Sequence, residues 1–422
     1  MTSKQRLLAT LNHTEPDRVC VDFGATPVTG IHVSVVSQLW QRTFGQRDYR
    51  VKVTEPYQML GEIDPGLRDA LGIDLLGVPG RKSLIGTSEE GPWKDFTMFD
   101  GTRVLIPNNL NYSVDPEKGD LLAYPEGDTS CAPSVRMPKG GHFWDTIIRQ
   151  YPVDDATLRV EDNTEEFSLL SEADLAYYEK KRRMLAQSQD YGTVLMMPGT
   201  AFGDIALVPA PFLKDPKGIR DIEEWYISAL VRRDWMYQVF ERQCEIGLKN
   251  IETLAALLGD LIDVVMVSGT DFGTQHGTFI SRETYRDLYK PFHIAINRKI
   301  HELTRWKTFI HSCGSVRDLI PDFIEAGFDI LNPVQCSAAG MEPKALKRDF
   351  GKDLVFWGGG VDTQKTLPYG TPEEVYREVR ERIEILGDGG GFVFNAIHNI
   401  QANVPVENVE AMFRAIRNHL TP

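Results

Sequence analysis

The feature of this sequence that most restricts its fold is a repeated unit in which a short apolar run leads through turn residues into an amphipathic helix. From residue 190 onward, such runs lie at 194–198, 264–268, 307–311, 329–333, 354–357 and 391–395. Two earlier runs, at 19–23 and 73–78, raise the count to eight. Eight parallel strands with helices between them close into a barrel, so we predict the α/β class and a (β/α)8 TIM barrel.

Turn and cap residues between these runs decide between a barrel and a dinucleotide-binding sheet. No Gly-x-Gly-x-x-Gly turn follows any of the runs, which makes the dinucleotide fold the weaker alternative. The segment Thr371-Pro372-Glu373-Glu374 combines a capping box with proline at the first helical position, and Gly387 is placed to end the helix. Both observations favour helices that connect successive strands of a barrel.

Residues from about 79 to 165 depart from this pattern, because glycine, proline, asparagine and aspartate are frequent there and the apolar periodicity is short. The Asp100-Gly101 pair between 94–98 and 103–106 is typical of a tight β-hairpin. We therefore predict one barrel domain over residues 1–422 with an inserted β-rich segment at about 79–165.

Charge and cysteine content argue against several classes of partner. The chain has 46 Lys and Arg residues against 60 Asp and Glu residues, a formal net charge of −14, and no basic block. This balance argues against nucleic acid and anionic membranes as partners. The 5 cysteines are scattered and odd in number, which fits free thiols in a reducing compartment. The polar start and the absence of a long apolar run lead us to expect a cytoplasmic protein.

A candidate metal site begins at the end of the fifth predicted barrel strand, where His311 and Cys313 follow an apolar run. Side chains two residues apart on an extended segment point the same way, and the carboxyl ends of barrel strands form the active face. Imidazole nitrogen and thiolate sulfur suit zinc, which at catalytic sites takes three protein ligands and keeps one open position. We predict His398, after the eighth strand, as the third ligand, with Cys336 as the alternative. The competing interpretation of His311 and Cys313 is an ordinary buried core pair.

Polar residues follow other strands on the same face. Asp271 and Gln275 lie among glycines after the fourth strand, next to His276, and could orient a polar substrate or move a proton. The competing interpretation of Asp271 is a cap on the turn before the helix at Ser281. We predict two catalytic residues, Asp271 and His398, and three substrate-binding residues, Gln275, Asn332 and Asn395.

The C-terminal half of the sequence resembles the uroporphyrinogen decarboxylase superfamily, which includes zinc-dependent methyltransferases that work with a corrinoid. Stretches that carry the resemblance extend from about residue 190 to the end, with a shorter match at Asn12–Val19 before the first strand. They are Asp271-Phe272-Gly273-Thr274-Gln275, Ser281–Tyr285 with Pro291, His311-Ser312-Cys313-Gly314, Ala326–Pro333, Thr371–Val375, Gly389–Phe392 leading to His398, and Pro405–Asn408. The family fold is a (β/α)8 barrel, in agreement with the strand count.

The resemblance favours the methyltransferase branch of this superfamily. True uroporphyrinogen decarboxylases carry an arginine-rich segment after the first strand, whereas here Val21–Pro27 contains no arginine, so carboxylates of a porphyrinogen would lack their guanidinium partners. His311 and Cys313 match the His-x-Cys zinc motif of the methyltransferases. Where that branch has a later cysteine ligand, this chain has His398, which matches a histidine of the decarboxylases.

What the resemblance implies is a zinc-dependent methyltransferase that transfers a methyl group to or from a corrinoid, free or carried by a partner protein, and acts on a small-molecule substrate. A site with one thiolate holds more positive charge than a site with two, and so favours an oxygen ligand over a bound thiolate. Two alternatives stay open: a metal-assisted decarboxylase or lyase for a small carboxylate or tetrapyrrole, and a non-catalytic corrinoid- or tetrapyrrole-binding protein.

Overall fold

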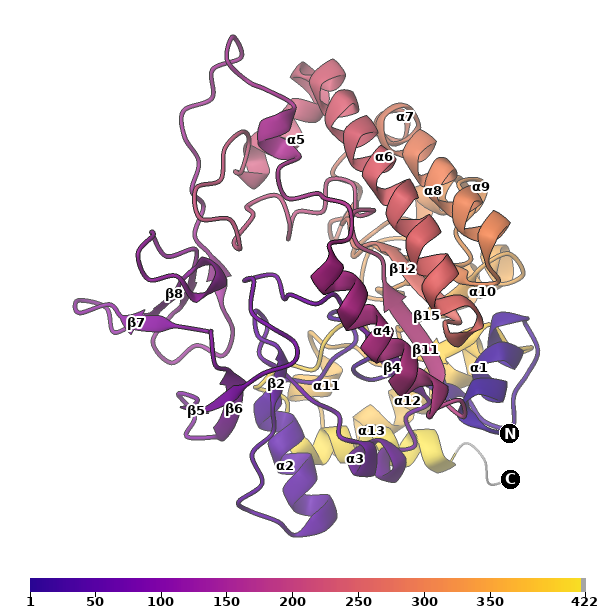
Figure 1. The fold of residues 1–422 in the computed structure, drawn as a ribbon. Helices are drawn as coiled ribbons and strands as arrows, with labels where there is room; N and C mark the ends of the chain where they lie inside the picture. Colours follow the sequence, from indigo (N-terminus) through magenta and orange to yellow (C-terminus); the bar gives the residue numbers. More distant parts are fainter. Residues whose placement is uncertain (419–422) are drawn as a thin grey trace.

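The computed structural model describes residues 1–418, and an eight-stranded parallel sheet curled into a barrel forms its centre (Figure 1). Its hydrogen-bonded order is β1-β16-β15-β14-β13-β12-β11-β4. All eight predicted barrel strands are confirmed. They are β1 (Cys20–Val21), β4 (Leu75–Val78), β11 (Gly192–Met196), β12 (Val264–Ser268), β13 (Lys307–His311), β14 (Ile330–Asn332), β15 (Val355–Trp357) and β16 (Phe392–Phe394).

Between β1 and β4 the barrel closes without a regular ladder. The Asp74 backbone N–H donates to the Val21 carbonyl at 2.9 Å, and the Asp74 carboxylate accepts the Val21 N–H at 2.9 Å. Ala25 crowds against Gly77 farther along, where a Cβ atom would lie 2.3 Å from the Ala25 carbonyl oxygen, so β4 needs glycine at that point. The predicted TIM-barrel fold is therefore confirmed, with a nearly closed barrel.

Helices cover the outside of the barrel, as expected for strand-helix repeats (Figure 1). The predicted capping box at Thr371 is present, with Pro372 in the first turn of its helix. Within 1–418 the helices are α1 (Ser3–Leu11), α2 (Val33–Phe44), α3 (Pro65–Leu71), α4 (Glu172–Ala186), α5 (Ile222–Val231), α6 (Arg233–Leu258), α7 (Arg282–Thr284), a π-helical turn (Tyr285–Tyr289), α8 (Lys290–Leu303), α9 (Ile320–Glu325), α10 (Pro343–Phe350), α11 (Thr366–Tyr369), α12 (Pro372–Leu386) and α13 (Val406–Asn418).

Helix α1 fills the amino-terminal end of the barrel. Its Leu7 and Leu11 pack with strand residues that point into the barrel, among them Val194, Phe309 and Trp357, and all five side chains are buried. Burial of these apolar groups closes this end to solvent. The opposite, carboxyl-terminal end remains the end at which polar loop residues can meet a substrate.

Short antiparallel strands occupy much of the segment before α4 and lie at the side of the barrel away from α6 and α8 (Figure 1). The predicted Asp-Gly hairpin is confirmed, with Gly101 at φ +87° between its two strands. These strands are β2 (Val53–Glu55) with β3 (Leu60–Gly61), β5 (Trp93–Thr97) with β6 (Arg103–Pro107), and the sheet of β7 (Tyr112–Val114), β8 (Leu121–Ala123), β9 (Val135–Met137) and β10 (Asp145–Thr146).

All five cysteines are free thiols, in agreement with the absence of a disulfide framework predicted from their spacing. Over the described part of the chain, every helix is too short or too polar to cross a membrane.

Candidate metal centre

His311 is the last residue of β13, and its neighbour across the ladder on β14 is Asn332. The His311 Nδ1 atom lies 2.6 Å from the Asn332 side-chain oxygen Oδ1. The Asn332 amide nitrogen donates to the Trp357 carbonyl at 2.9 Å, which fixes the orientation of the amide and makes Oδ1 an acceptor. Nδ1 of His311 therefore carries the proton, and Nε2 is left with a free lone pair, as a metal ligand requires.

Cys313 lies two residues beyond His311, and the two side chains point the same way, as predicted. The Cys313 Sγ atom is 3.4 Å from His311 Nε2. Donors on a tetrahedral zinc with bonds of ~2.0–2.3 Å are separated by roughly 3.3–3.8 Å. The observed separation fits two ligands of one metal ion.

His398 completes the group from the loop after β16. Asn399 holds this loop in place by accepting the Gly30 N–H at 2.5 Å, and its amide donates to the Pro27 carbonyl and to Gln58. The rings of His398 and His311 pack edge to face with centroids 5.4 Å apart. A ring nitrogen of His398 lies within 4.8 Å of the donor atoms of His311 and Cys313, where it can bind a ligand shared with them.

The donor atoms of His311, Cys313 and His398 all lie within 4.8 Å of one another and could hold a metal ion. The structure thus brings together the three residues predicted from the sequence. The alternative ligand, Cys336, is not a member of this group, because its thiol contacts the carbonyls of Val334 at 3.3 Å and Gly359 at 3.7 Å.

Local pKa values fit a site built for a cation. Burial lowers the pKa of His311 and of His398, the latter to about 3, so both imidazoles are neutral at neutral pH and can donate a lone pair. Burial and the nearby Asp271 carboxylate raise the pKa of the Cys313 thiol. A bound divalent cation reverses this local balance and stabilises the thiolate.

Asp271 reaches the site because two loops approach each other closely. Gly314 has φ +86°, and a Cβ atom there would lie 2.4 Å from the Gly273 carbonyl carbon, so the loops after β12 and β13 could not meet with a larger residue at this position. The Cys313 N–H donates to Asp271 Oδ1 at 2.6 Å, and the same oxygen lies 3.8 Å from His311 Nε2. The predicted turn-capping alternative is not observed: Ser281 caps its own helix by accepting the Thr284 N–H.

The predicted substrate-binding residues occupy three different environments. Asn332 is buried with both ends of its amide bonded within the protein, so its observed contact is to His311. Asn395 is also buried and donates to the Asp22 and Thr29 carbonyls, while its own oxygen has no hydrogen-bond partner. Gln275 donates to Gln364 at 3.1 Å in the loop after β15.

Three residues that the sequence analysis missed lie at the same end of the barrel. Gln335 accepts the Gly314 N–H at 2.7 Å, and the Tyr226 hydroxyl on α5 donates to the Asp271 carbonyl at 3.1 Å. Asp204, in the loop after β11, interacts electrostatically with Asp271 and Cys313. The only sequence signal for Asp204 is its position after a barrel strand. His276, which is exposed, lies outside the metal group.

Comparison with known sequences relates the part of the chain that carries the site to one protein family. The sequence profile described as uroporphyrinogen decarboxylase (URO-D) matches residues 234–419, a range that contains β12 to β16 and all three candidate ligands. This part of the chain is similar to the uroporphyrinogen decarboxylase family. The resemblance noted from the sequence motifs is therefore confirmed.

Two curated relatives cover shorter stretches of the URO-D-like chain. Over 150 residues, 34% of the chain, it is 29% identical to a methylated-thiol–coenzyme M methyltransferase of Methanosarcina mazei. Over 98 residues, 22% of the chain, it is 29% identical to a uroporphyrinogen decarboxylase of Mannheimia succiniciproducens. These matches span 36% and 27% of the lengths of the two relatives.

Among solved structures, a methyltransferase from Methanosarcina mazei is similar over 99% of both chains, with a TM-score of 0.53 and 14% sequence identity. At this identity the similarity shows a shared fold. It extends over the N-terminal part of the chain, which the family profile does not reach.

Proposed function

We propose that this protein is a zinc-dependent methyltransferase that transfers a methyl group to or from a corrinoid, either free or carried by a partner protein. The observation that carries the proposal is the convergence of His311, Cys313 and His398 within 4.8 Å at the end of the barrel where substrates bind. Partial similarity to a methylated-thiol–coenzyme M methyltransferase supports it.

The three ligands suit zinc, and neighbouring residues hold two of these ligands in place. Two neutral imidazoles and one thiolate are borderline-soft donors, and three protein ligands leave a fourth position for a substrate. When bound, zinc supplies Lewis acidity, which lowers the pKa of a substrate hydroxyl or thiol. Asn332 keeps His311 in the tautomer that presents Nε2, and Asp271 accepts the Cys313 N–H and so fixes the Cys313 backbone.

A single thiolate has a consequence for the substrate. With His398 in place of a second cysteine, the site carries less negative charge, and we infer a preference for an oxygen nucleophile or leaving group, such as an alcohol or phenol, over a thiol. His398→Cys tests this inference: the variant should keep its zinc and shift methyl transfer towards thiol acceptors. An unchanged ratio of oxygen to thiol acceptors would contradict it.

A metal-assisted decarboxylase or lyase is the second candidate, favoured by the partial similarity to a uroporphyrinogen decarboxylase. In this alternative His398 and Asp271 would act as acid and base. The electrostatics weigh against an anionic substrate. Within residues 1–418, neither Asp204 nor Asp271 has a lysine or arginine ion-pair partner, so no cation paired with them is available to bind a substrate carboxylate. Val21–Pro27 also contains no arginine.

Elemental analysis followed by a methyl-transfer assay tests the proposal. The purified protein should contain about one zinc per chain, and the zinc-loaded protein should demethylate methylcobalamin in the presence of a phenol, an alcohol or a thiol, seen as a change in the cobalamin absorbance spectrum. His311→Ala and the chelated wild-type protein are the controls. Zinc without demethylation, together with turnover of uroporphyrinogen at ~1 s⁻¹ or more, would favour the second candidate.

A further inference from the structure

A second carboxylate, that of Asp204, lies at the same end of the barrel as the metal group. Asp204 belongs to the loop after β11, and β11 is the ladder neighbour of β12, after which Asp271 follows. Its Oδ1 atom accepts the Ala206 N–H at 2.9 Å. Its Oδ2 atom rests against Gly269, where a Cβ atom would lie only 2.6 Å away. Glycine at 269 therefore allows Asp204 to approach the Asp271 loop.

The carboxylates of Asp204 and Asp271 differ in the hydrogen bonds and charged groups that surround them. The Asp271 carboxylate accepts the Cys313 N–H at 2.6 Å and lies 3.8 Å from His311 Nε2, so it contacts the metal group directly. The Asp204 carboxylate has one hydrogen bond, from the Ala206 backbone N–H, and no lysine or arginine ion pair within residues 1–418. When two carboxylates lie close together, the less stabilised one binds a proton more readily.

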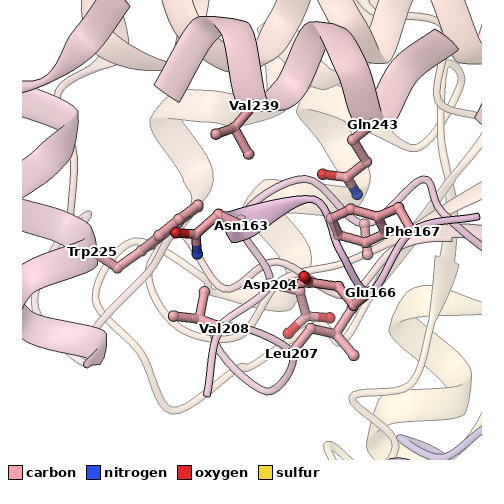
Figure 2. A pocket seen from close by; sticks show the side chains of 11 residues that line it. Asn163, Glu166, Phe167, Asp204, Leu207, Val208, Trp225, Val239 and Gln243 are labelled. Atoms are coloured by element: carbon pink, nitrogen blue, oxygen red, sulfur yellow. The ribbon is translucent and has the colours of Figure 1, made fainter. Parts of the chain in front are cut away.

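A small cavity adjoins Asp204 on its α6 side (Figure 2). Its volume is about 20 Å³, enough for one water molecule. Trp225 and Gln243 line it, are 3% and 1% exposed, and each has a side-chain nitrogen donor without a hydrogen-bond partner. A water in this cavity can accept from one or both donors and donate to a carboxylate. Glu166, the other carboxylate in the lining, is paired with the buried Arg220 at 2.8 Å, which leaves Asp204 as the acceptor.

The surroundings of Asp204 raise its pKa, so that its carboxyl group can both bind and release a proton near neutral pH. Burial, with a further contribution from Asp271, raises the pKa of Asp204 to about 7. The other titratable groups that face it are Tyr226 from α5, Cys313 from the loop after β13, and Glu166. None of these is a cation, so none lowers the proton affinity of Asp204.

We propose that Asp204 is a catalytic acid–base residue that takes the proton from the hydroxyl or thiol group of the methyl acceptor and exchanges it with the cavity water. This inference rests on the proposed function. In the step, the O–H or S–H bond of the acceptor breaks, the electron pair stays on oxygen or sulfur, and the proton forms a new O–H bond on Asp204. In the reverse direction, Asp204 returns the proton to the demethylated oxygen or sulfur.

Asp204→Asn tests the assignment, with Asp190→Asn as the matched control. Asp190 is exposed and lies before β11, at the opposite end of the same strand. In the wild-type protein and in Asp190→Asn, infrared difference spectra should show protonated-carboxyl absorbance that titrates near pH 7, to which both Asp204 and the Glu55 carboxyl contribute, because burial raises the pKa of each to about 7. Asp204→Asn should lose the Asp204 share of this absorbance, seen as the difference between the wild-type and variant titrations, while the Glu55 share stays. The variant should also retain its zinc and lower kcat for methyl transfer from methylcobalamin by ~10²-fold or more with a flattened pH profile.

Two results would overturn the assignment: a carboxyl band that persists unchanged in Asp204→Asn, or an Asp204→Asn enzyme with the wild-type kcat and pH profile. A zinc-loaded wild-type protein that does not demethylate methylcobalamin overturns the proposed function instead, and the infrared titration then decides by itself whether Asp204 holds the proton. If Asp204→Asn does not fold, Trp225→Phe removes one cavity donor while retaining the aromatic ring. This variant should shift the midpoint of the carboxyl band upward, and an unmoved midpoint would count against the cavity water.

Discussion

At the amino-terminal end of the barrel strands, the fully buried carboxylate of Asp74 pairs with Arg6 at 2.6 Å and Arg18 at 2.7 Å and accepts the Val21 N–H. At the carboxyl-terminal end, Asp204 and Asp271 lie near the candidate metal ligands without a lysine or arginine partner among residues 1–418. The compensated carboxylate of Asp74 holds the barrel closed, whereas burial and Asp271 raise the pKa of Asp204 at the opposite end. The difference agrees with the general division of barrel enzymes into an end that supports stability and an end that carries the active site.

Loss of one metal ligand should have the largest effect. Cys313→Ala removes the thiolate and should lower zinc affinity by more than the ~10–100-fold typical of residues that only support a ligand. Zinc competition with a chelator measures the change, and Cys336→Ala is the matched control because Cys336 lies outside the group. Equal losses of affinity in the two variants would show that the ligand set is wrong.

Of the substitutions considered, replacement of Asp74 should have the largest effect on the free energy of unfolding. Asp74→Asn leaves Arg6 and Arg18 without their shared partner and should lower the free energy of unfolding by about 3–5 kcal/mol. Urea unfolding measures it, with Asp48→Asn, an exposed aspartate, as the control. Zinc content should stay near one per chain. A variant that loses its zinc while remaining folded would contradict the view that Asp74 supports stability alone and that metal binding depends only on the opposite end of the barrel.

The contact between Asn332 and His311 should have an intermediate effect. Asn332→Ala removes the acceptor for the His311 Nδ1–H and should weaken zinc binding by about 10–100-fold. Asn332→Asp keeps an acceptor oxygen and should bind zinc more tightly than Asn332→Ala. Isothermal titration with zinc compares the two variants, and equal affinities would mean that the orientation of His311 does not depend on this contact.

Replacement of Asp22 should have the smallest effect, a change in how the free energy of unfolding depends on pH. It is fully buried at the end of β1, accepts from Trp357 Nε1 at 3.0 Å, and has a pKa raised to about 6, chiefly by burial. Because this pKa is higher in the folded state than the ~3.9 of an unfolded chain, folding takes up a proton, and stability is lost as the pH rises from about 4 through 6. Between about pH 4.5 and 7.5, the free energy of unfolding of wild type should fall by about 1–3 kcal/mol relative to that of Asp22→Asn. Parallel pH profiles of urea unfolding would contradict this.

Much of the fold could be predicted because barrel strands carry local signals. All eight predicted barrel strands are present, and the capping box at Thr371 and the hairpin at Asp100-Gly101 are where the sequence placed them. The partners Arg6 and Arg18 of Asp74 were not predicted, since an ion pair between residues 68 and 56 positions apart leaves no periodic pattern. In the same way, the close approach of Gly314 to Gly273 becomes visible only when two strands stand side by side.

The candidate metal site was partly predictable for the same reason. His311 and Cys313 are two residues apart on one strand, so their shared direction follows from strand geometry alone. His398 required the further assumption that carboxyl ends of barrel strands meet, and the structure places its ring beside His311. Cys336 satisfies the same assumption, yet its thiol faces the Val334 and Gly359 carbonyls, a distinction that depends on side-chain direction in a loop.

The sequence by itself determined the order of strands and helices, the end of the barrel that carries polar residues, and the pairing of a histidine with a cysteine at one strand end, because these depend on residue spacing along the chain. Only the tertiary structure decided that Asp204 faces the Asp271 loop across Gly269, that Asn332 fixes the His311 tautomer, and that Trp225 and Gln243 leave two donors around a water-sized cavity. Those relations depend on distances between segments far apart in the chain. Burial and charge, which set the proton affinity of Asp204, exist only after the segments have packed.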